Sequence, residues 1–255
     1  MSGRGCVEAR FYEPRLNGES GAEGVARYDP GMKRVIVVLA LTAALTAVLL
    51  PCDGAVSGWF QKHAPGGDVR RSLEALQQYG DVGTILIVSA VVFLLDRERR
   101  LRLWDLYLAS AATGLVCVAL KMLVGRPRPQ LGAPGTFLWP WGTYPLPAPG
   151  HPAVSVAAHA WEVGRHGAQL WSMPSSHTAA AMALSLYLIH VYPRLRPLAV
   201  AMVLLVGCGR VITGAHYPTD LIVGAAVGYL VSAPLIRREA GTRLVGRWRG
   251  GSGRL

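Results

Sequence analysis

Six apolar runs divide the chain, and polar or basic segments separate them. Each run predicts a membrane-spanning helix, because uncharged apolar stretches of this kind cross the hydrocarbon core of a bilayer. The expected fold class is all-α, a polytopic bundle of six transmembrane helices. The runs cover about Val35–Leu50, Val82–Leu95, Leu103–Leu123, Thr178–Val191, Pro197–Gly209 and Leu221–Ile236.

The second run, Val82–Leu95, contains only fourteen residues. At 1.5 Å per residue it reaches about 21 Å. We therefore expect its outer end to include Ala75–Asp81, with the polar side chains facing protein or head groups. The preceding residues 52–75 are polar and are typical of an external loop that carries an interfacial helix near Val69–Gln78.

A loop of some fifty residues, Gly125–Pro174, lies between the third and fourth runs and is rich in Pro, Gly and Trp. Its secondary structure does not follow from the sequence, and loops of this length in compact proteins are usually functional. Its tryptophans indicate interfacial anchors or the walls of a lipid access route. They are Trp139, Trp141, Trp161 and Trp171.

The membrane domain is expected to span residues 33–238. Residues 1–32 are polar and aperiodic, which predicts a mobile tail. Residues 239–255 are basic and predict a poorly ordered tail. A cleaved signal peptide is an alternative reading of the first run. The proline before Cys52 and the lack of an A-x-A site disfavour it.

Six spans place both termini on one side of the membrane, together with the connectors 96–102 and 192–197. All four segments contain arginines, so the positive-inside rule assigns that side to the cytoplasm. The loop 125–174 and the stretch 210–220 then share the outer face. In a bacterial-type inner or plasma membrane that face is periplasmic or extracellular.

Composition agrees with a membrane protein, since 51% of the residues are hydrophobic, 16% are charged and the mean hydropathy is +0.32. The net charge of +11 would suggest nucleic acid in a soluble protein. Here the arginines flank apolar runs, and no basic–aromatic interleaving is present, which disfavours a nucleic-acid partner. The four cysteines form no C-x-x-C pair or His/Cys cluster, which predicts neither a structural metal nor a disulfide framework.

Three polar clusters fall on the predicted outer face, and each has a plain structural alternative. The alternatives are a lysine that extends to the head groups, a histidine at the membrane interface and an aspartate that caps a helix. Their location on one face favours a catalytic role over these structural ones, because cations, histidines and a carboxylate together suit the handling of a phosphoryl group. The clusters are Lys121 with Arg126 and Arg128; Ser175, Ser176 and His177; and Arg210, His216 and Asp220.

The order and spacing of these clusters resemble the three-part motif of the type 2 phosphatidic acid phosphatase (PAP2) superfamily. The first part is Lys121, six residues, then Arg128-Pro129; the second is Pro174-Ser175-Ser176-His177. The third is Arg210, five residues, His216, three residues, then Asp220. The resemblance implies a six-helix membrane phosphatase that needs no metal or other cofactor.

Carried over position by position, the resemblance implies that His216 is the nucleophile that forms a phosphohistidine. Asp220 would hold its imidazole in the reactive tautomer, and His177 would protonate the leaving oxygen and then activate water. The phosphate oxygens would be bound by Lys121, Arg128, Arg210, Ser175 and the backbone N–H groups around Ser176.

Two positions depart from the family pattern. Gly209 stands where a serine is usual, and we expect this to remove a hydrogen bond. Ser176 stands where glycine is usual. Arg126 repeats the dipeptide of Arg128, and we interpret it as a residue behind the phosphate site or at the head groups. Three loop histidines match no motif and are expected to have ordinary surface roles; they are His151, His159 and His166.

The predicted substrate is a lipid phosphate or pyrophosphate: polyprenyl pyrophosphate first, then lipid A, phosphatidylglycerol phosphate and phosphatidic acid. Membrane lipids are the other expected partners, and the sequence does not indicate an oligomeric state. A lipid phosphotransferase of the same superfamily and a non-enzymatic binder or transporter of anionic lipid are the alternatives. Membrane spans disfavour a vanadate-dependent haloperoxidase, which shares the motif.

Overall fold

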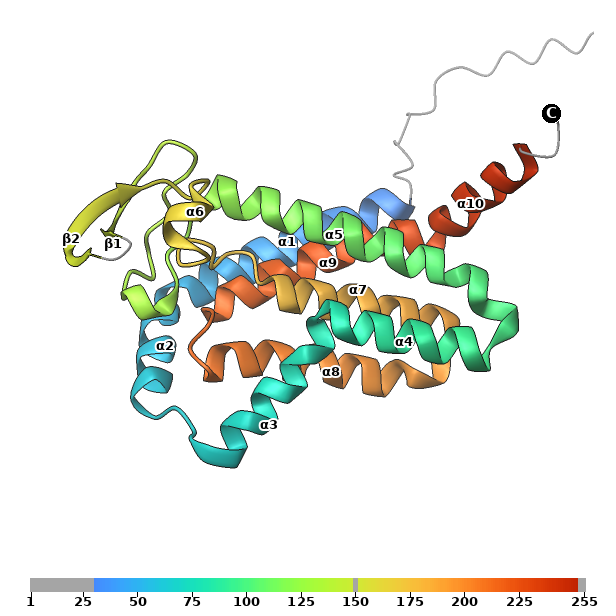
Figure 1. Cartoon of the computed structure of the whole chain (residues 1–255), viewed down its shortest axis with the longest axis horizontal. Coiled ribbons are helices and arrows are strands. Elements are labelled where there is room, and N and C mark those ends of the chain that lie inside the picture. The colour runs from blue at the N-terminus through green and yellow to red at the C-terminus, as the bar shows by residue number, and fades with distance from the viewer. Residues whose placement is uncertain (1–29, 149–150, 252–255) are drawn as a thin grey trace, which may run out of the picture.

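The structure is a computed structural model that describes residues 30–148 and 151–251. Its long helices run side by side in one bundle, and a loop-rich cap closes one end (Figure 1). The helices are α1 Pro30–Leu49, α2 Asp53–Lys62, α3 Gly67–Gln77, α4 Val82–Leu95, α5 Leu103–Val124, α6 Val163–His166, α7 Ser176–Val191, α8 Arg196–Ile212, α9 Pro218–Arg237 and α10 Ala240–Gly251.

Each of the six predicted spans coincides with a helix, but not every one is long enough to cross a membrane alone. In the described part, four helical segments are long and apolar enough to cross a membrane. The bent pair α3–α4 would make a fifth if it forms one span. Helix α7 is apolar but has only 16 residues. The count of six therefore stays a prediction. The four segments are Gly31–Lys62, Arg97–Leu131, Pro193–Ile212 and Pro218–Arg237.

The outer part of the second span is not a straight extension of α4. A 3-10 turn, Gln78–Gly80, follows α3, and the chain bends by 64° before α4 begins at Val82. Asp81 caps α4, since its carboxylate accepts the Val82 N–H at 2.6 Å. Helix α3 matches the predicted interfacial helix. Residues 53–62 were expected in a loop but form helix α2.

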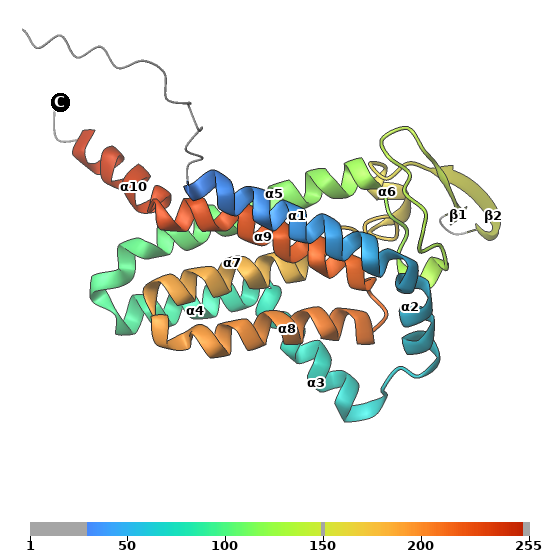
Figure 2. The same cartoon turned by 180° about the vertical axis from the view of Figure 1, so that it is seen from behind.

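Helix α7 lies among α5, α8 and α9 (Figures 1 and 2). Glycines on α9 allow its backbone to approach α7 closely. A Cβ atom on Gly224 would lie 2.6 Å from the carbonyl oxygen of Ser175, and one on Gly228 would lie 2.5 Å from that of Ala179. These contacts leave no room for a side chain, so the two glycines set the distance between α7 and α9.

The long loop, whose secondary structure the sequence left open, is folded and adds a small β hairpin to an otherwise helical structure. Strands β1 Tyr144–Ala148 and β2 His151–Ala158 form an antiparallel hairpin, in which Leu146 pairs with Val156. A small apolar core holds the loop together; its buried members are Leu138, Leu146, Ala158, Ala160 and Leu170. Because these residues bury their own small core, the loop forms a folded cap at the end of the bundle.

The cap and the α8–α9 connection lie at one end of the bundle, and the α4–α5 and α7–α8 connections lie at the other (Figures 1 and 2). This agrees with the pairing of connectors deduced from the six runs. The predicted tail 1–32 lies outside the described residues as far as position 29, and α1 begins at Pro30.

The C-terminal segment was expected to be poorly ordered, and this is wrong for Ala240–Gly251, which form α10. The helix is attached to α5 by two hydrogen bonds from Thr242 to the carboxylate of Asp105, at 2.9 and 2.7 Å. Gly241 allows the contact, because a Cβ there would lie 2.1 Å from the carbonyl oxygen of Trp104. Pairing with a buried carboxylate therefore orders a segment that composition alone marks as disordered.

Candidate active site

Tertiary packing joins the three motif clusters at the capped end of the bundle. The Ser175 N–H, just before α7, donates to the backbone oxygen of Asp220 in α9 at 3.0 Å. The turn between α8 and α9 folds back, so that the His216 N–H donates to the Arg210 carbonyl at 3.2 Å. The second and third clusters are thus connected through their backbones.

His216 and Asp220 lie together, as their spacing predicts, although His216 precedes α9. The His216 Nδ1 atom is 3.4 Å from Asp220 Oδ2, and both side chains are almost completely buried. The same oxygen accepts a hydrogen bond from Ser172 Oγ at 2.5 Å and from the Tyr217 N–H at 2.9 Å. Asp220 is therefore held in one orientation, with His216 at its edge.

Burial keeps the His216 imidazole neutral. Desolvation is the main cause that lowers its pKa from 6.5 to about 3, while the Asp220 carboxylate acts in the opposite direction and Lys121 and Arg210 act with desolvation. A neutral imidazole has a free lone pair on one nitrogen. With Nδ1 facing the carboxylate, Nε2 is the nitrogen left for nucleophilic attack.

Three cations of the motif are held by neutral oxygens. Lys121 Nζ donates to the Trp171 carbonyl at 2.7 Å, Arg128 Nε to that of Ala168 at 2.8 Å, and Arg210 to Gln77 Oε1 at 2.9 Å. Within the described residues, no acidic side chain forms an ion pair with any of the three. Lys121 is coupled electrostatically to both arginines. In the part of the chain that the structure describes, these cations therefore have no carboxylate at ion-pair distance, and Asp220 acts on Lys121 and Arg128 only from farther away.

The start of α7 contributes His177 and two serines. Ser175 is the N-cap, and its hydroxyl accepts from Thr178 Oγ1 at 3.0 Å, as the sequence predicts for a helix start. Ser176 and His177 line a mostly apolar cavity of about 510 Å³, bounded by α4, α5 and α7. Lys121, Arg128 and Arg210 are close enough to His177 to interact with it electrostatically.

For Arg126, the sequence left two locations open, behind the phosphate site or at the head groups. Its side chain is completely buried, which excludes a head-group contact, and it lies behind the site. The guanidinium donates to Asp220 Oδ1 at 2.6 Å and to Asp53 Oδ2 at 2.7 Å. Tyr217 packs against it, with the ring centre 4.2 Å from the guanidinium carbon.

Sequence reasoning missed Asp53, Ser172 and Gln77, which all contact motif residues. None belongs to a motif, and each is far along the chain from its partner. Only Asp53 carries a signal, because an acidic residue directly after an apolar run is costly unless it has a partner.

Gln77 explains the glycine at position 209. A Cβ atom there would lie 3.2 Å from both Cγ and Nε2 of Gln77, whose amide oxygen accepts from Arg210. The space of the usual serine is therefore taken by a glutamine from α3. In place of the hydrogen bond that the glycine was expected to remove, Arg210 donates one to the amide oxygen of Gln77.

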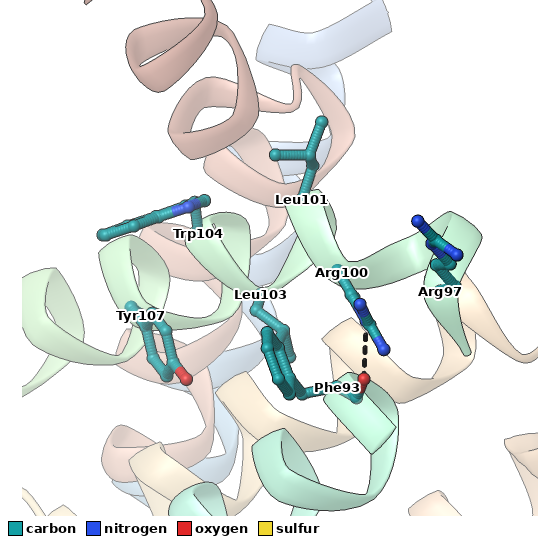
Figure 3. A pocket seen from close by; sticks show the side chains of 7 residues that line it. All are labelled: Phe93, Arg97, Arg100, Leu101, Leu103, Trp104 and Tyr107. Atoms are coloured by element: carbon teal, nitrogen blue, oxygen red, sulfur yellow. Dashed lines mark hydrogen bonds between the residues drawn. The ribbon is translucent and has the colours of Figure 1, made fainter. Parts of the chain in front are cut away.

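Other candidates lie away from these clusters. His159 Nδ1 lies 3.0 Å from the Gly142 carbonyl, inside the cap, and the side chains of His151 and His166 lie outside the described part. A cavity of about 520 Å³ at the α4–α5 connection is lined by Arg97, Arg100 and Trp104 among others. Figure 3 shows its seven lining residues, none of which is a histidine. The α4–α5 connection lies at the end of the bundle opposite the α8–α9 connection (Figure 1).

Trp139, Trp141 and Trp161 expose more than half of their side chains, and Trp171 instead packs on the cap core. Their predicted roles at a membrane remain predictions. Across residues 30–148 and 151–251, His, Cys, Asp and Glu side chains form no group of three that could hold a metal ion. The prediction of a metal-free reaction is not tested by this.

Comparison with known proteins places the motif in a family context. A sequence model of the PAP2 superfamily matches residues 102–241. The chain is 26% identical over 172 residues to a lipid A 1-phosphatase of Rhizobium etli, which covers 61% of this chain and 65% of the relative. It is 28% identical over 159 residues to a decaprenylphosphoryl-5-phosphoribose phosphatase of Mycobacterium tuberculosis, which covers 62% and 73%.

The chain thus spans less than two thirds of the length of the Rhizobium relative. Two solved structures are similar in fold. A transmembrane PAP2-type phosphatidylglycerolphosphate phosphatase from Bacillus subtilis matches with a TM-score of 0.55 at 18% identity, over 82% of this chain and 97% of the other. LpxE from Aquifex aeolicus matches with a TM-score of 0.50 at 19% identity, over 71% and 93%.

Proposed function

The chain belongs to the PAP2 superfamily, and we propose that it is an integral-membrane phosphatase that hydrolyses a lipid phosphate or pyrophosphate through a phosphohistidine on His216. The observation that carries the proposal is the cluster of three cations that form no ion pair within the described residues, beside a buried, neutral histidine. Such a cluster is complementary to the equatorial oxygens of a transferring phosphoryl group.

In the first step, Nε2 of His216 attacks phosphorus, and the bond from phosphorus to the lipid oxygen breaks. His177 gives a proton to that oxygen as it leaves. In the second step, a water molecule attacks phosphorus, His177 accepts its proton, and the P–N bond breaks to release phosphate. Asp220 faces Nδ1–H throughout and offsets the positive charge that the phosphorylated ring carries.

Lys121, Arg128 and Arg210 bind the phosphoryl oxygens. The N–H groups at the start of α7 add to this, because a helix N-terminus has unpaired donors and a positive dipole end. The Ser175 hydroxyl faces the helix as its cap. The Ser175 N–H already donates to the Asp220 carbonyl, so we assign the backbone contribution to the N–H groups of Ser176 and His177.

The substrate is a phosphorylated membrane lipid. The apolar cavity beside Ser176 and His177 supports this, since it would take a chain while the head group meets the cations. The similar proteins are a lipid A 1-phosphatase, a decaprenylphosphoryl-5-phosphoribose phosphatase and a phosphatidylglycerolphosphate phosphatase. For this chain we propose the same chemical class: polyprenyl pyrophosphate, lipid A, phosphatidylglycerol phosphate or phosphatidic acid.

We further propose that the site faces the outside of a bacterial-type inner or plasma membrane, with both termini in the cytoplasm. The arginine-rich connectors support this orientation, because they lie at the end of the bundle opposite His216. Six spans are part of the same proposal.

The test is phosphate release from a panel of these lipids in detergent, comparing wild type with His216→Ala. We expect the variant to release no phosphate above background. His190→Ala is the matched control, because His190 is exposed near the far end of α7 and should leave the rate unchanged. Equal release by wild type and His216→Ala would contradict the mechanism.

Two further outcomes would change the proposal. A phosphorylated acceptor lipid formed without free phosphate would indicate a phosphotransferase. Loss of activity with a chelator, restored by a divalent metal, would contradict a metal-independent reaction.

A further inference from the structure

A buried ion triad lies directly behind the proposed nucleophile. Arg126 joins Asp220, at 2.6 Å from NH1 to Oδ1, to Asp53, at 2.7 Å from NH2 to Oδ2. All three side chains are completely buried. They come from α2, from the segment after α5 and from α9, so the triad is formed only in the folded chain.

The hydrogen bonds of Arg126 are fully used inside the protein. Besides the two carboxylates, it donates to Thr219 Oγ1 at 2.8 Å and to the Pro134 carbonyl at 3.2 and 2.5 Å. This engages all three guanidinium nitrogens, and no face remains for a substrate. Arg126 therefore differs from Lys121, Arg128 and Arg210, and acts on other protein groups.

Asp53 completes the same network from the other side. It accepts the backbone N–H of Thr219 at 3.1 Å and also the Thr219 hydroxyl. Thr219 directly precedes Asp220 at the start of α9. Asp53 is thus connected to Asp220 both through Arg126 and through the backbone.

The number of charges matters as much as the geometry. Two carboxylates and one guanidinium leave the triad with one net negative charge. If the cluster held only Arg126 and Asp220, their charges would cancel at short range, and little negative potential would reach His216. The charge of Asp53 offsets that of the Arg126 guanidinium. The triad as a whole therefore presents a net negative charge to the His216 imidazole.

We propose that Asp53 and Arg126 are positioning residues for His216. Arg126 binds Oδ1 of Asp220 and leaves Oδ2 toward Nδ1 of His216, and Asp53 preserves the net negative charge of the triad. The inference rests on the proposed function, because the charge is needed when Nε2 bonds to phosphorus. At that point the ring becomes cationic, with its proton on Nδ1 facing the carboxylate.

A purely structural triad would hold α2 against α9 without affecting the chemical step. The two roles differ in the measurement that they affect. If the triad positions His216, a change in it lowers the rate constant for phosphorylation of His216. This loss occurs only while the carboxylate at position 220 is present. A structural role lowers stability, and its effect adds to that of any change at Asp220.

The experiment uses Asp53→Asn in the full-length protein, which removes the charge and keeps the shape. Rapid-quench measurement of phosphohistidine gives the rate constant per phosphorylated site. Unfolded molecules in the sample therefore do not lower the measured rate constant. We expect this rate constant and kcat to fall by about ten- to a hundredfold, by analogy with the loss of a partner behind a metal-binding histidine, with KM little changed.

The matched control is Asp105→Asn, the same change at another buried carboxylate, located at the other end of the bundle. It should leave the phosphorylation rate unchanged. In an Asp220→Asn background, we expect Asp53→Asn to cause no further loss of the residual rate, because it acts through Asp220.

A wild-type rate constant in Asp53→Asn, with or without lower thermal stability, would overturn the inference and leave the proposed function intact. A further loss that multiplies with that of Asp220→Asn would also overturn it. If wild type itself forms no phosphohistidine and releases no phosphate, the proposed function fails first, and the inference fails with it.

Discussion

His216 shows how burial alone can prepare a side chain for a reaction. Its imidazole is almost inaccessible to solvent, and the loss of water favours the neutral form over the cation. Asp220 lies at 3.4 Å and acts in the opposite direction, but desolvation is the larger effect. The folded protein thus places a neutral nucleophile next to a carboxylate that can offset the positive charge of the phosphorylated ring.

We predict that His216 remains neutral from pH 7 down to about pH 4, since its pKa is lowered to about 3. The unfolded chain binds a proton near pH 6.5, so the stability contributed by His216 is present above that pH and is lost as the pH falls toward 3. NMR of histidine-labelled protein checks this, with His216→Asn to assign the signal. A midpoint near 6.5 would contradict the prediction.

A second prediction concerns Gly209 and Gln77. Gly209→Ser should displace Gln77 from Arg210, because the new Cβ lies only 3.2 Å from its side chain. Hydrogen bonds to charged groups contribute about 1.5–3 kcal/mol, so we expect KM to rise by about tenfold. Adding Gln77→Ala should lower KM again, since the serine then has the space to itself.

Phosphate release at varied substrate concentration gives these KM values. Gly58→Ser is the control, because a Cβ there meets no atom within 4 Å. If Gly209→Ser and the double variant have the same KM, Gln77 does not determine the requirement for glycine.

Between helices, the decisive contact is that of α7 with α9. Helix α7 carries His177, and α9 carries Asp220 and begins directly after His216 and Tyr217. The glycines of α9 bring their backbones together, and the Ser175–Asp220 hydrogen bond at 3.0 Å depends on that approach. Helix packing therefore sets the distance between the proposed general acid and the proposed nucleophile.

Gly224→Ala should separate these helices, since its Cβ would lie 2.6 Å from the Ser175 carbonyl. We expect overpacking to cost about 1–3 kcal/mol of stability and to lower kcat. Thermal unfolding and phosphate release in detergent measure both effects. Gly83→Ala is the control, because its site is open; equal behaviour of the two variants would refute the close-packing argument.

The molecule as a whole has two chemically different ends. One end holds the cap, the α8–α9 connection and the three cations of the proposed site. The other end holds the arginine-rich connectors, with Arg97, Arg99, Arg100, Arg102, Arg194 and Arg196. Because cationic connectors are retained in the cytoplasm, the site end is expected outside.

We predict that green fluorescent protein fused after Leu255 fluoresces in bacterial cells, whereas alkaline phosphatase at the same position is inactive. Both results follow if the C-terminus is cytoplasmic, because the first reporter folds there and the second folds only outside. A fusion within the cap, for example after Gly142, should give the reverse pattern. Active alkaline phosphatase at the C-terminus would invert the proposed orientation.

Much of the site could be predicted from sequence, because its chemistry depends on residue types at short, regular spacings. His216 and Asp220 are four positions apart, and the Pro-Ser-Ser-His stretch predicts a capped helix start. The apolar runs likewise predicted the long helices, since each follows from local hydrophobicity. Failures occurred where long-range contacts override local pattern, as in α2, the β hairpin and α10.

By itself, the sequence determined the family, the helical core and the identity of the motif residues, because these follow from composition and from spacing along the chain. Only the tertiary structure decided that Arg126 lies behind Asp220, that Asp53 completes its charge balance and that Gln77 fills the space at Gly209. Those partners are separated by at least 73 positions in each case. Packing of the folded chain brings them together, and no local pattern encodes such a meeting.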